Sequence, residues 1–304
     1  MTRIVIIGEA MLELSDLDGD NVHLAYGGDT LNTAIYLARL GCAPHYVTAL
    51  GQDGFSDRMR LEWEKEGVRT DHILRHPTRL PGLYAIETDD QGERRFHYWR
   101  SESAARAFFD LPDHKHALAF AAKADWLFVS GITLSIFDQA ERDALIQTAR
   151  AVRARGGHVV FDPNYRPKGW ASPKAAWSAM KPFAEETSLA LPTHDDEDTL
   201  HGSATCSAHA ERWKALGVSN IILKRGSSGA MIFASDQDPV HVPADSVLVP
   251  KDTTGAGDSF NAALIASLVS GRSLEEAVKT ANRLAAYVIQ HAGAIAPQAG
   301  MPSL

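Results

Sequence analysis

The sequence predicts a single α/β domain over residues 1–304, with a mainly parallel sheet, helices on both of its faces and a small additional β sheet. Two observations favour this fold. Short runs rich in β-branched residues alternate with amphipathic stretches of helical length, as they do where each crossover between parallel strands is a helix. Hydrophobic residues make up 45% of the chain and charged residues 22%, which is typical of a globular protein.

The strand-like runs are short and apolar, as strands buried on both faces are. They lie at residues 4–8, 46–50, 126–130, 159–162, 188–191, 221–224 and 231–233. The helix-like stretches carry apolar residues at intervals of three and four. They lie at residues 29–40, 55–66, 135–155, 257–269 and 274–291. Glycines such as Gly41 and Gly67 follow two of these stretches and are suited to end a helix.

One region departs from the alternation. Residues 83–88 and 95–100 are strand-like, and the segment 89–93 between them has the composition of a hairpin turn. With residues 12–26 they predict a small β lid, contributed by about 12–26 and 80–101. The exposed edges and face of such a lid favour contact with another copy of the chain.

Side chains alternate along a strand, so Phe96, Tyr98 and Arg100 share one face of the predicted lid. Two interpretations stay open. The face is an amphipathic edge with a solvated arginine, or the lid presents Arg100 to an anionic ligand.

The charge and the cysteines exclude several classes of protein. The formal net charge is -8 and no block rich in Lys and Arg occurs, which argues against nucleic acid as a partner. No apolar run approaches the length of a membrane span, and residues 4–8 are too few for a signal peptide. Cys42 and Cys206 form no disulfide or metal motif. We expect a cytoplasmic protein with no membrane partner.

The segment 252–260 carries the clearest chemical signal. Gly255, Ala256 and Gly257 directly precede a helical stretch, so free backbone amides at a helix start can bind a phosphate. Asp258 falls in the first turn, where we expect its carboxylate to be stabilised as the ion and to be a weak base. Phosphoryl transfer tolerates such a base. The alternative is a plain helix cap with an N-terminal charge.

Other catalytic motifs are missing from the sequence. It contains no GxxxxGK[ST] loop, and the region of Gly8 lacks GxGxxG. The 13 histidines form no HExxH pattern, and no GxSxG is present.

Two long motifs carry a family resemblance. Residues 252–258 resemble the C-terminal signature of the ribokinase-like (PfkB) carbohydrate kinases, and residues 27–34 resemble their N-terminal sugar-binding signature. The resemblance covers essentially the whole chain. It implies a three-layer αβα sandwich with a β lid that phosphorylates a sugar with ATP and Mg²⁺, and it leaves a monovalent cation open.

Further segments resemble the members of this family that phosphorylate the sugar acid 2-keto-3-deoxygluconate. These segments are residues 8–15, 80–88, 92–100, 130–132 and 162–167. The exposed lid predicts a homo-oligomer, whereas the resemblance implies a set of sugar-acid contacts: Gly28, Asp29, Asn32, Tyr84, Tyr98, Arg100, Ile132, Arg166 and Asp258. It implies that Asp258 is the base, with Gly255, Ala256 and Gly257 beside it. It places Asn164, Lys224, Arg225, Gly226, Gly229, Gly255, Gly257 and Asn282 around ATP.

The residue types agree with an acidic substrate, because guanidinium groups match carboxylates. Arg166 follows a predicted strand, where ligands of such sheets collect. Its alternative role is a loop arginine that pairs with a nearby acid. For Lys224 the alternative to a phosphate contact is a solvated strand end.

The metal site departs from the family pattern. Family members often carry Asn-x-x-Glu near the phosphates, whereas this chain has Thr193 and Asp196 at the corresponding spacing. Asp196 is the candidate ligand, through water, for Mg²⁺. An acidic helix start explains the same residues. Two other functions remain, a kinase of a neutral sugar such as fructose and a sugar-acid sensor without catalysis.

Overall fold

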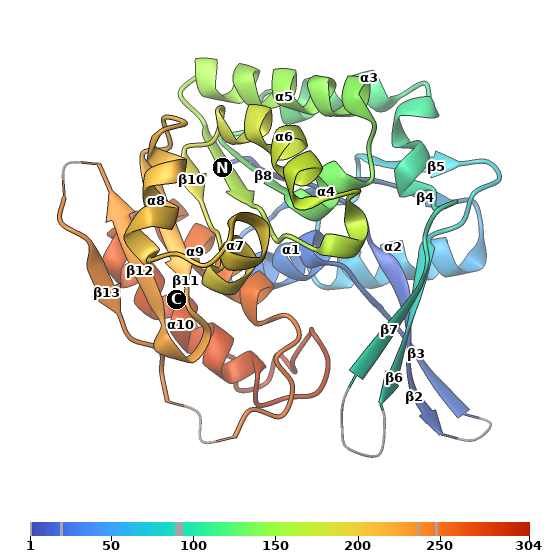
Figure 1. The fold of residues 1–304 in the computed structure, drawn as a ribbon. Coiled ribbons are helices and arrows are strands. Elements are labelled where there is room, and N and C mark those ends of the chain that lie inside the picture. Colours follow the sequence, from blue (N-terminus) through green and yellow to red (C-terminus); the bar gives the residue numbers. More distant parts are fainter. Residues whose placement is uncertain (1, 19–20, 89–93, 236, 247–248) are drawn as a thin grey trace.

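A computed structural model of the chain describes residues 2–18, 21–88, 94–235, 237–246 and 249–304 (Figure 1). Within these residues a nine-stranded sheet forms the centre. In spatial order its strands are β13 (Val240–Val242), β12 (Ala230–Ala234), β11 (Asn220–Lys224), β10 (Leu189–Ala190), β9 (His158–Asp162), β8 (Trp126–Ser130), β1 (Ile4–Ile7), β4 (His45–Gly51) and β5 (Ile73–His76). Only the pairs that involve β12 are antiparallel, which confirms a mainly parallel sheet.

Helices cover both faces of the sheet (Figure 1). One layer contains α1 (Asp29–Arg39), α2 (Gly54–Lys65), α9 (Ala256–Val269) and α10 (Leu274–Val288). The other contains α3 (His114–Ala121), α4 (Gly131–Ser135), α5 (Gln139–Ala154), α6 (Pro173–Ala184), α7 (His194–His201) and α8 (Cys206–Lys214). Among the described residues no helix is long and apolar enough to cross a membrane.

Strand β1 shows how the sheet separates two hydrophobic cores. All four of its residues are buried. Ile4 and Ile6 pack into the core on one face, and Val5 and Ile7 into the core on the other. Successive side chains of a strand point to opposite faces, so the continuous apolar run is explained by helices on both sides.

A separate sheet of four strands forms the lid, which projects from the sandwich (Figure 1). In spatial order its strands are β3 (Asn21–Gly27), β2 (Met11–Asp18), β6 (Gly82–Thr88) and β7 (Arg94–Trp99). β6 and β7 pair as the predicted antiparallel hairpin, while their predicted turn at 89–93 lies outside the described residues. β2 and β6, remote in sequence, pair in parallel.

The predicted helix at 135–155 is wrong in its first part. Ser130 caps the short α4, and Asp138 begins α5 with a capping box to Glu141. Two caps so close together force a break, because a capping residue is not itself helical.

The sequence also missed several elements: β5, β13, α3, α6 and α8, and the three short 3₁₀ turns η1 (Ala105–Asp110), η2 (Pro167–Gly169) and η3 (Gly226–Ser228). α6 contains Pro182, which obscured its helical pattern. α7 is mostly polar, and the structure confirms the acidic helix start that was one interpretation of the residues after Thr193.

Candidate active site

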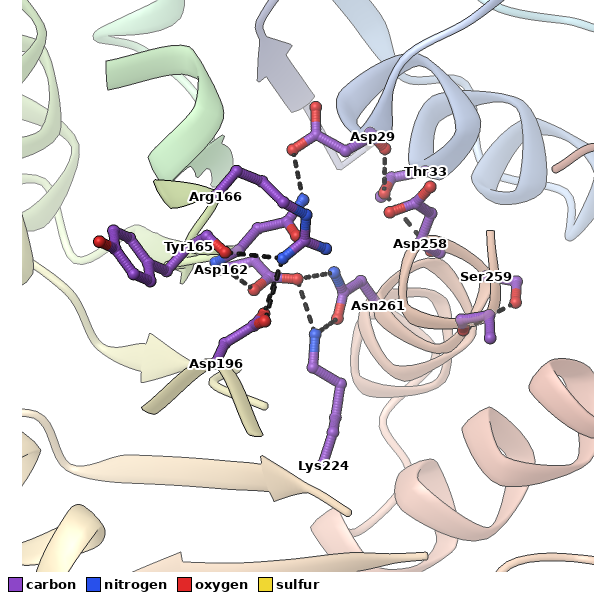
Figure 2. Close-up of polar contacts among 12 residues, drawn as sticks. Asp29, Thr33, Asp162, Tyr165, Arg166, Asp196, Lys224, Asp258, Ser259 and Asn261 are labelled. Atoms are coloured by element: carbon purple, nitrogen blue, oxygen red, sulfur yellow. Dashed lines mark hydrogen bonds and ion pairs between the residues drawn. The ribbon is translucent and has the colours of Figure 1, made fainter. Parts of the chain in front are cut away.

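The residues with the clearest chemistry meet where strands and helices of the sandwich end. Asp162 is the last residue of β9 and Lys224 the last of β11, while Asp29 begins α1 and Asp258 lies in the first turn of α9. Figure 2 shows their side chains converging on one space. Ligands of parallel sheets bind beyond the carboxyl ends of the strands, so this edge is the candidate active site.

The N-terminus of α9 offers an anion-binding surface. Gly255 has φ 77°, and a Cβ there would lie 2.9 Å from Cα of Ala294 and closer still to its carbonyl oxygen. Only glycine fits this left-handed turn. The backbone amides of Gly257 and Asp258 donate to no acceptor among the residues that the structure describes. Two such donors at a helix start attract a phosphate.

Asp258 is held over this surface by α1. Asn32 donates from Nδ2 to Oδ2 of Asp258 at 2.8 Å. Burial, the negative charge of Asp29 and that of Asp162 raise the pKa of Asp258 to about 7, against the opposing effects of Asn32 and Lys224. The expectation of a strongly acidic carboxyl group is therefore wrong. A pKa near neutrality suits a general base.

Lys224 is not a solvated strand end, which corrects one of the two sequence interpretations. The residue is only 7% exposed. Its Nζ donates to Asp162 at 2.7 Å and to Asn261 at 3.2 Å. Asn261 in turn donates to the same oxygen of Asp162 at 2.6 Å. The lysine therefore lies in a closed polar triangle below the first turn of α9.

Asn164 joins the sugar side of the site through Asp29. Its Nδ2 donates to Oδ2 of Asp29 at 2.9 Å, and its backbone amide donates to Asp162 at 3.0 Å. Among the described residues it is the only one other than glycine with a positive φ, of 35°. A left-handed backbone at this point suits asparagine better than most residues. The side chain that was assigned to ATP is thus committed to Asp29.

Arg166 and Asp196 form an ion pair. Nη1 of Arg166 lies 3.0 and 3.1 Å from the two carboxylate oxygens of Asp196 and donates to the carbonyl of Tyr165 at 2.8 Å. Nε and Nη2 have no acceptor among the described residues, and the side chain is 55% exposed. The arginine pairs with a nearby acid and still offers two donors to a ligand.

The lid brings aromatic side chains and a second arginine to the same space. Tyr84 and Tyr98 pair across β6 and β7, with ring centroids 6.0 Å apart. Burial raises the pKa of Tyr98, while the positive charges of Arg100 and Arg166 oppose the rise. Burial and the negative charge of Glu13 raise the pKa of Tyr84. The negative charge of Asp258 adds to this rise. Tyr98 therefore lies near both arginines, and Tyr84 near the base.

Buried carboxylates hold two of these lid residues. The hydroxyl of Tyr84 donates to Glu13, and Arg100 pairs with Glu9, which also accepts from Ser103. The side chain of Glu9 is 1% exposed. Glu9 and Glu13 were not predicted as site residues, although buried acids among apolar residues are unusual and indicate a role for their charge.

The remaining predicted residues fall into two places. Gly28 packs against the backbone of Glu9, and Ile132 lies in α4, whose start touches the carbonyl of Pro163. Away from them, Arg225, Gly226 and Gly229 form the turn around η3. Asn282 donates to the carbonyls of Val242 and Pro243 at 3.3 and 2.9 Å, and Gly229 also packs against Val242. Of the residues assigned to ATP, these four therefore lie around the η3 turn, Lys224, Gly255 and Gly257 lie at the start of α9, and Asn164 lies on the sugar side.

One histidine cluster was not foreseen. Possible ligand atoms of His194, Asp198 and His209 lie within 4.8 Å of one another. However, Arg212 is 2.6 Å from Nδ1 of His209, and Nε2 of the same ring is 2.7 Å from Asp198. Since arginine can only donate, Nδ1 accepts and Nε2 carries the proton. The group is a hydrogen-bond chain with no free lone pair on His209 for a metal.

Comparison with known proteins agrees with this geometry. The model of the pfkB family carbohydrate kinases matches residues 1–299. The 2-dehydro-3-deoxygluconokinase of Dickeya dadantii is 42% identical over 99% of both chains. That of Haemophilus influenzae is 39% identical over 97% of this chain and 96% of its own.

A solved structure of a PfkB protein from Polaromonas sp. JS666 is similar, with a TM-score of 0.84, 26% identity and coverage of 97% of each chain. The strand ends, the α9 N-terminus and the four-stranded lid thus belong to a shared architecture. The chain is a member of the pfkB family of carbohydrate kinases.

Proposed function

We propose that the chain, as a single domain over residues 1–304, transfers the γ-phosphate of ATP to the terminal hydroxyl of 2-keto-3-deoxygluconate and forms the 6-phosphate. One observation carries the proposal. A carboxyl group with a pKa near 7, that of Asp258, lies beside two free amides and faces a space that Arg166 and Tyr98 border. The Dickeya dadantii 2-dehydro-3-deoxygluconokinase, 42% identical over 99% of this chain, supports the choice of sugar acid.

The residues of the chain divide the reaction between them. The oxygen of the substrate hydroxyl bonds to the γ-phosphorus while Asp258 takes the hydroxyl proton. The bond between the γ-phosphorus and the β–γ bridging oxygen breaks, and ADP leaves. The amides of Gly257 and Asp258 stabilise the negative charge on the transferred group. The turn from Arg225 to Gly229 and Asn282 bind the nucleotide.

The charges of the site favour a bound cation. Four carboxylates, those of Asp29, Asp162, Asp196 and Asp258, face the cations Lys224 and Arg166 in Figure 2. ATP adds further negative charge, so a divalent ion is needed to balance the site. Carboxylate oxygens fit Mg²⁺. Asp196 would hold the ion through water, and the ion would neutralise the phosphates. We also propose that a monovalent cation binds to the protein.

We propose that Arg166 and Arg100 bind the carboxylate of the substrate. Nε and Nη2 of Arg166 present a fork that matches a carboxylate, while Nη1 stays on Asp196. Arg100, which pairs with Glu9, adds a second guanidinium group from the lid. A neutral sugar such as fructose has no carboxylate to match this fork.

The lid supports a proposal about assembly. Trp99 on β7 is 61% exposed and Val22 on β3 is 50% exposed. Large apolar side chains at the exposed edges of a small sheet favour pairing with another copy. We propose a homo-oligomer joined through the lid, acting in the cytoplasm on small molecules only.

A coupled ADP-release assay across sugar acids and neutral sugars tests the function. We expect 2-keto-3-deoxygluconate to have the highest kcat/KM, at least about tenfold above fructose and ribose. A neutral sugar with the higher kcat/KM overturns the substrate. Sugar-acid binding without turnover on any sugar indicates a sensor.

A further inference from the structure

Lys224 is a buried cation that takes no part in the proposed phosphate transfer. Its Nζ contacts Asp162 at 2.7 Å and Asn261 at 3.2 Å, and the asparagine closes the triangle with a bond of 2.6 Å to Asp162 (Figure 2). The side chains of Lys224 and Asp162 are 9% and 5% exposed. Buried charges are fixed in place by their partners, because moving them apart leaves each unpaired in a medium of low dielectric.

The triangle joins three elements that are far apart in sequence. Lys224 ends β11, Asp162 ends β9 and Asn261 lies on α9. The strand between them, β10, contains only two residues, so the lysine side chain reaches past its end. Asn261 is three residues after Asp258 and lies on the same side of the helix. The contacts therefore hold the first turn of α9 against the sheet.

The ammonium group also lies behind the anion-binding amides. A Cβ added at Gly257 would be 3.7 Å from Nζ of Lys224. The positive charge is thus within the reach of both the phosphate position and the base. In a poorly hydrated site such a charge acts strongly.

Several groups face Asp258 from the elements packed around it. They are Asp29, Asn32 and Tyr36 from α1, Asp162 from β9, Lys224 from β11 and Tyr84 from β6. Of the charged groups among them, only Lys224 is positive, and it lowers the pKa of Asp258, while Asp29 and Asp162 raise it.

We infer that Lys224 is a positioning residue, which fixes the first turn of α9 through Asp162 and Asn261 and places a positive charge behind the base. It acts on the reaction through Asp258 and the helix start, in place of the direct ATP contact that the sequence favoured. The inference rests on the proposed function, since it requires Asp258 to accept the proton.

The test uses Lys224→Met, Lys224→Arg and the double variant Lys224→Met/Asp162→Asn, with Lys181→Met as the control. Lys181 is exposed and pairs with Glu185 at 2.9 Å. The pH profile of kcat/KM for the sugar and the KM for ATP are measured for each protein, with the sugar that the wild type phosphorylates best. A neutral sugar in that place refutes the proposed substrate but leaves this test intact.

For Lys224→Met we expect kcat to fall about tenfold or more. Asp162 still accepts from Asn261 and from the amide of Asn164, while the cation that lowers the pKa of Asp258 is gone. The acidic limb of the profile then moves up by about half a pH unit or more. In the double variant the limb returns towards that of the wild type, because opposite charges are removed together. Lys224→Arg recovers part of kcat, and all variants keep KM for ATP within about twofold.

A direct phosphate contact gives a different result. KM for ATP then rises about tenfold or more in Lys224→Met and in the double variant, with the limb unmoved, and this overturns the inference. If Lys224→Met fails to fold, the double variant decides, since it leaves no unpaired buried charge. Its KM for ATP stays unchanged if the lysine positions and rises if the lysine binds phosphate.

Discussion

The phosphate side of the site and the lid side hold their polar groups in different ways. On the phosphate side, Asp162, Lys224 and Asn261 are more than nine-tenths buried and bond to one another, and Asp162 also accepts from the backbone amide of Asn164. On the lid side, Tyr98 is 47% exposed and Trp99 is 61% exposed, and the arginine that follows them is held at the root of the lid by Glu9.

The difference indicates that the phosphate side determines the rate of phosphate transfer and the lid side the preference between sugars. Buried, mutually bonded groups cannot turn without breaking several contacts, so the phosphate side is already organised for the transition state. A half-exposed sheet can adjust around a ligand, and closing it excludes water. Changes on the phosphate side should therefore reduce turnover of every sugar, whereas changes among the sugar contacts should alter the preference between sugars.

The largest effect is expected for Asp258→Asn. Loss of the base should lower kcat by about 10²–10⁴ with every sugar, while sugar binding, measured by calorimetry, stays within severalfold of the wild type. Undiminished turnover would remove Asp258 from the reaction. Loss with one sugar alone would contradict the proposed division.

Gly255→Ala should follow, because the added Cβ meets the backbone of Ala294 and the residue has φ 77°. Displacing the helix start by even 1 Å costs on the order of 10² in rate. Gly271→Ala is the matched control, since Gly271 has φ 87° but nothing within 4 Å of the added Cβ. The control should lose stability and keep kcat. Equal kcat values for the two variants would contradict the role of the α9 start.

Arg166→Gln tests the sugar side. We expect kcat/KM for 2-keto-3-deoxygluconate to fall about 30-fold, as for a lost charge-assisted hydrogen bond of about 2 kcal/mol, with little change for a neutral sugar. Arg150→Gln is the control, because Arg150 forms an exposed ion pair with Glu186. Equal losses for acidic and neutral sugars would count against a carboxylate contact.

The pH profile of kcat/KM gives a smaller effect. Asp258 must be ionised to accept a proton, and its pKa is raised to about 7. Activity should therefore be level above pH ~7 and fall about tenfold for each unit below it. A profile that stays level down to pH ~5 would mean that the helix start keeps the carboxyl group strongly acidic after all.

The smallest effect concerns stability. The pKa of Asp258 is higher in the folded protein than in the unfolded chain, so the folded state binds the proton more tightly. Folding stability from this group is then lost as pH rises from about 4 to about 7. Asp258→Asn should raise Tm at pH ~8 and leave it unchanged at pH ~4, measured by calorimetry. An unchanged Tm at both values would contradict the raised pKa.

The sequence by itself determined the sandwich, the lid and the location of the chemistry. Period-two and helical patterns, glycines and caps are local signals, and they predicted β1, β6, β7, α1 and α9. The short segment from Gly255 to Asp258 showed both the glycine turn and the acid before any contact was known. α6, which contains a proline, gave no such signal, and the polar α7 showed only its acidic start.

Only the tertiary structure decided which groups bond and how they titrate. Asn32 contacts Asp258 across 226 positions, Asn164 contacts Asp29 across 135 and Lys224 contacts Asp162 across 62. No local pattern encodes such pairs, because they depend on the order of strands in the sheet. The pKa of Asp258 and the burial of Lys224 follow from these neighbours, and so the sequence could find the base and the lysine but could not assign their environment.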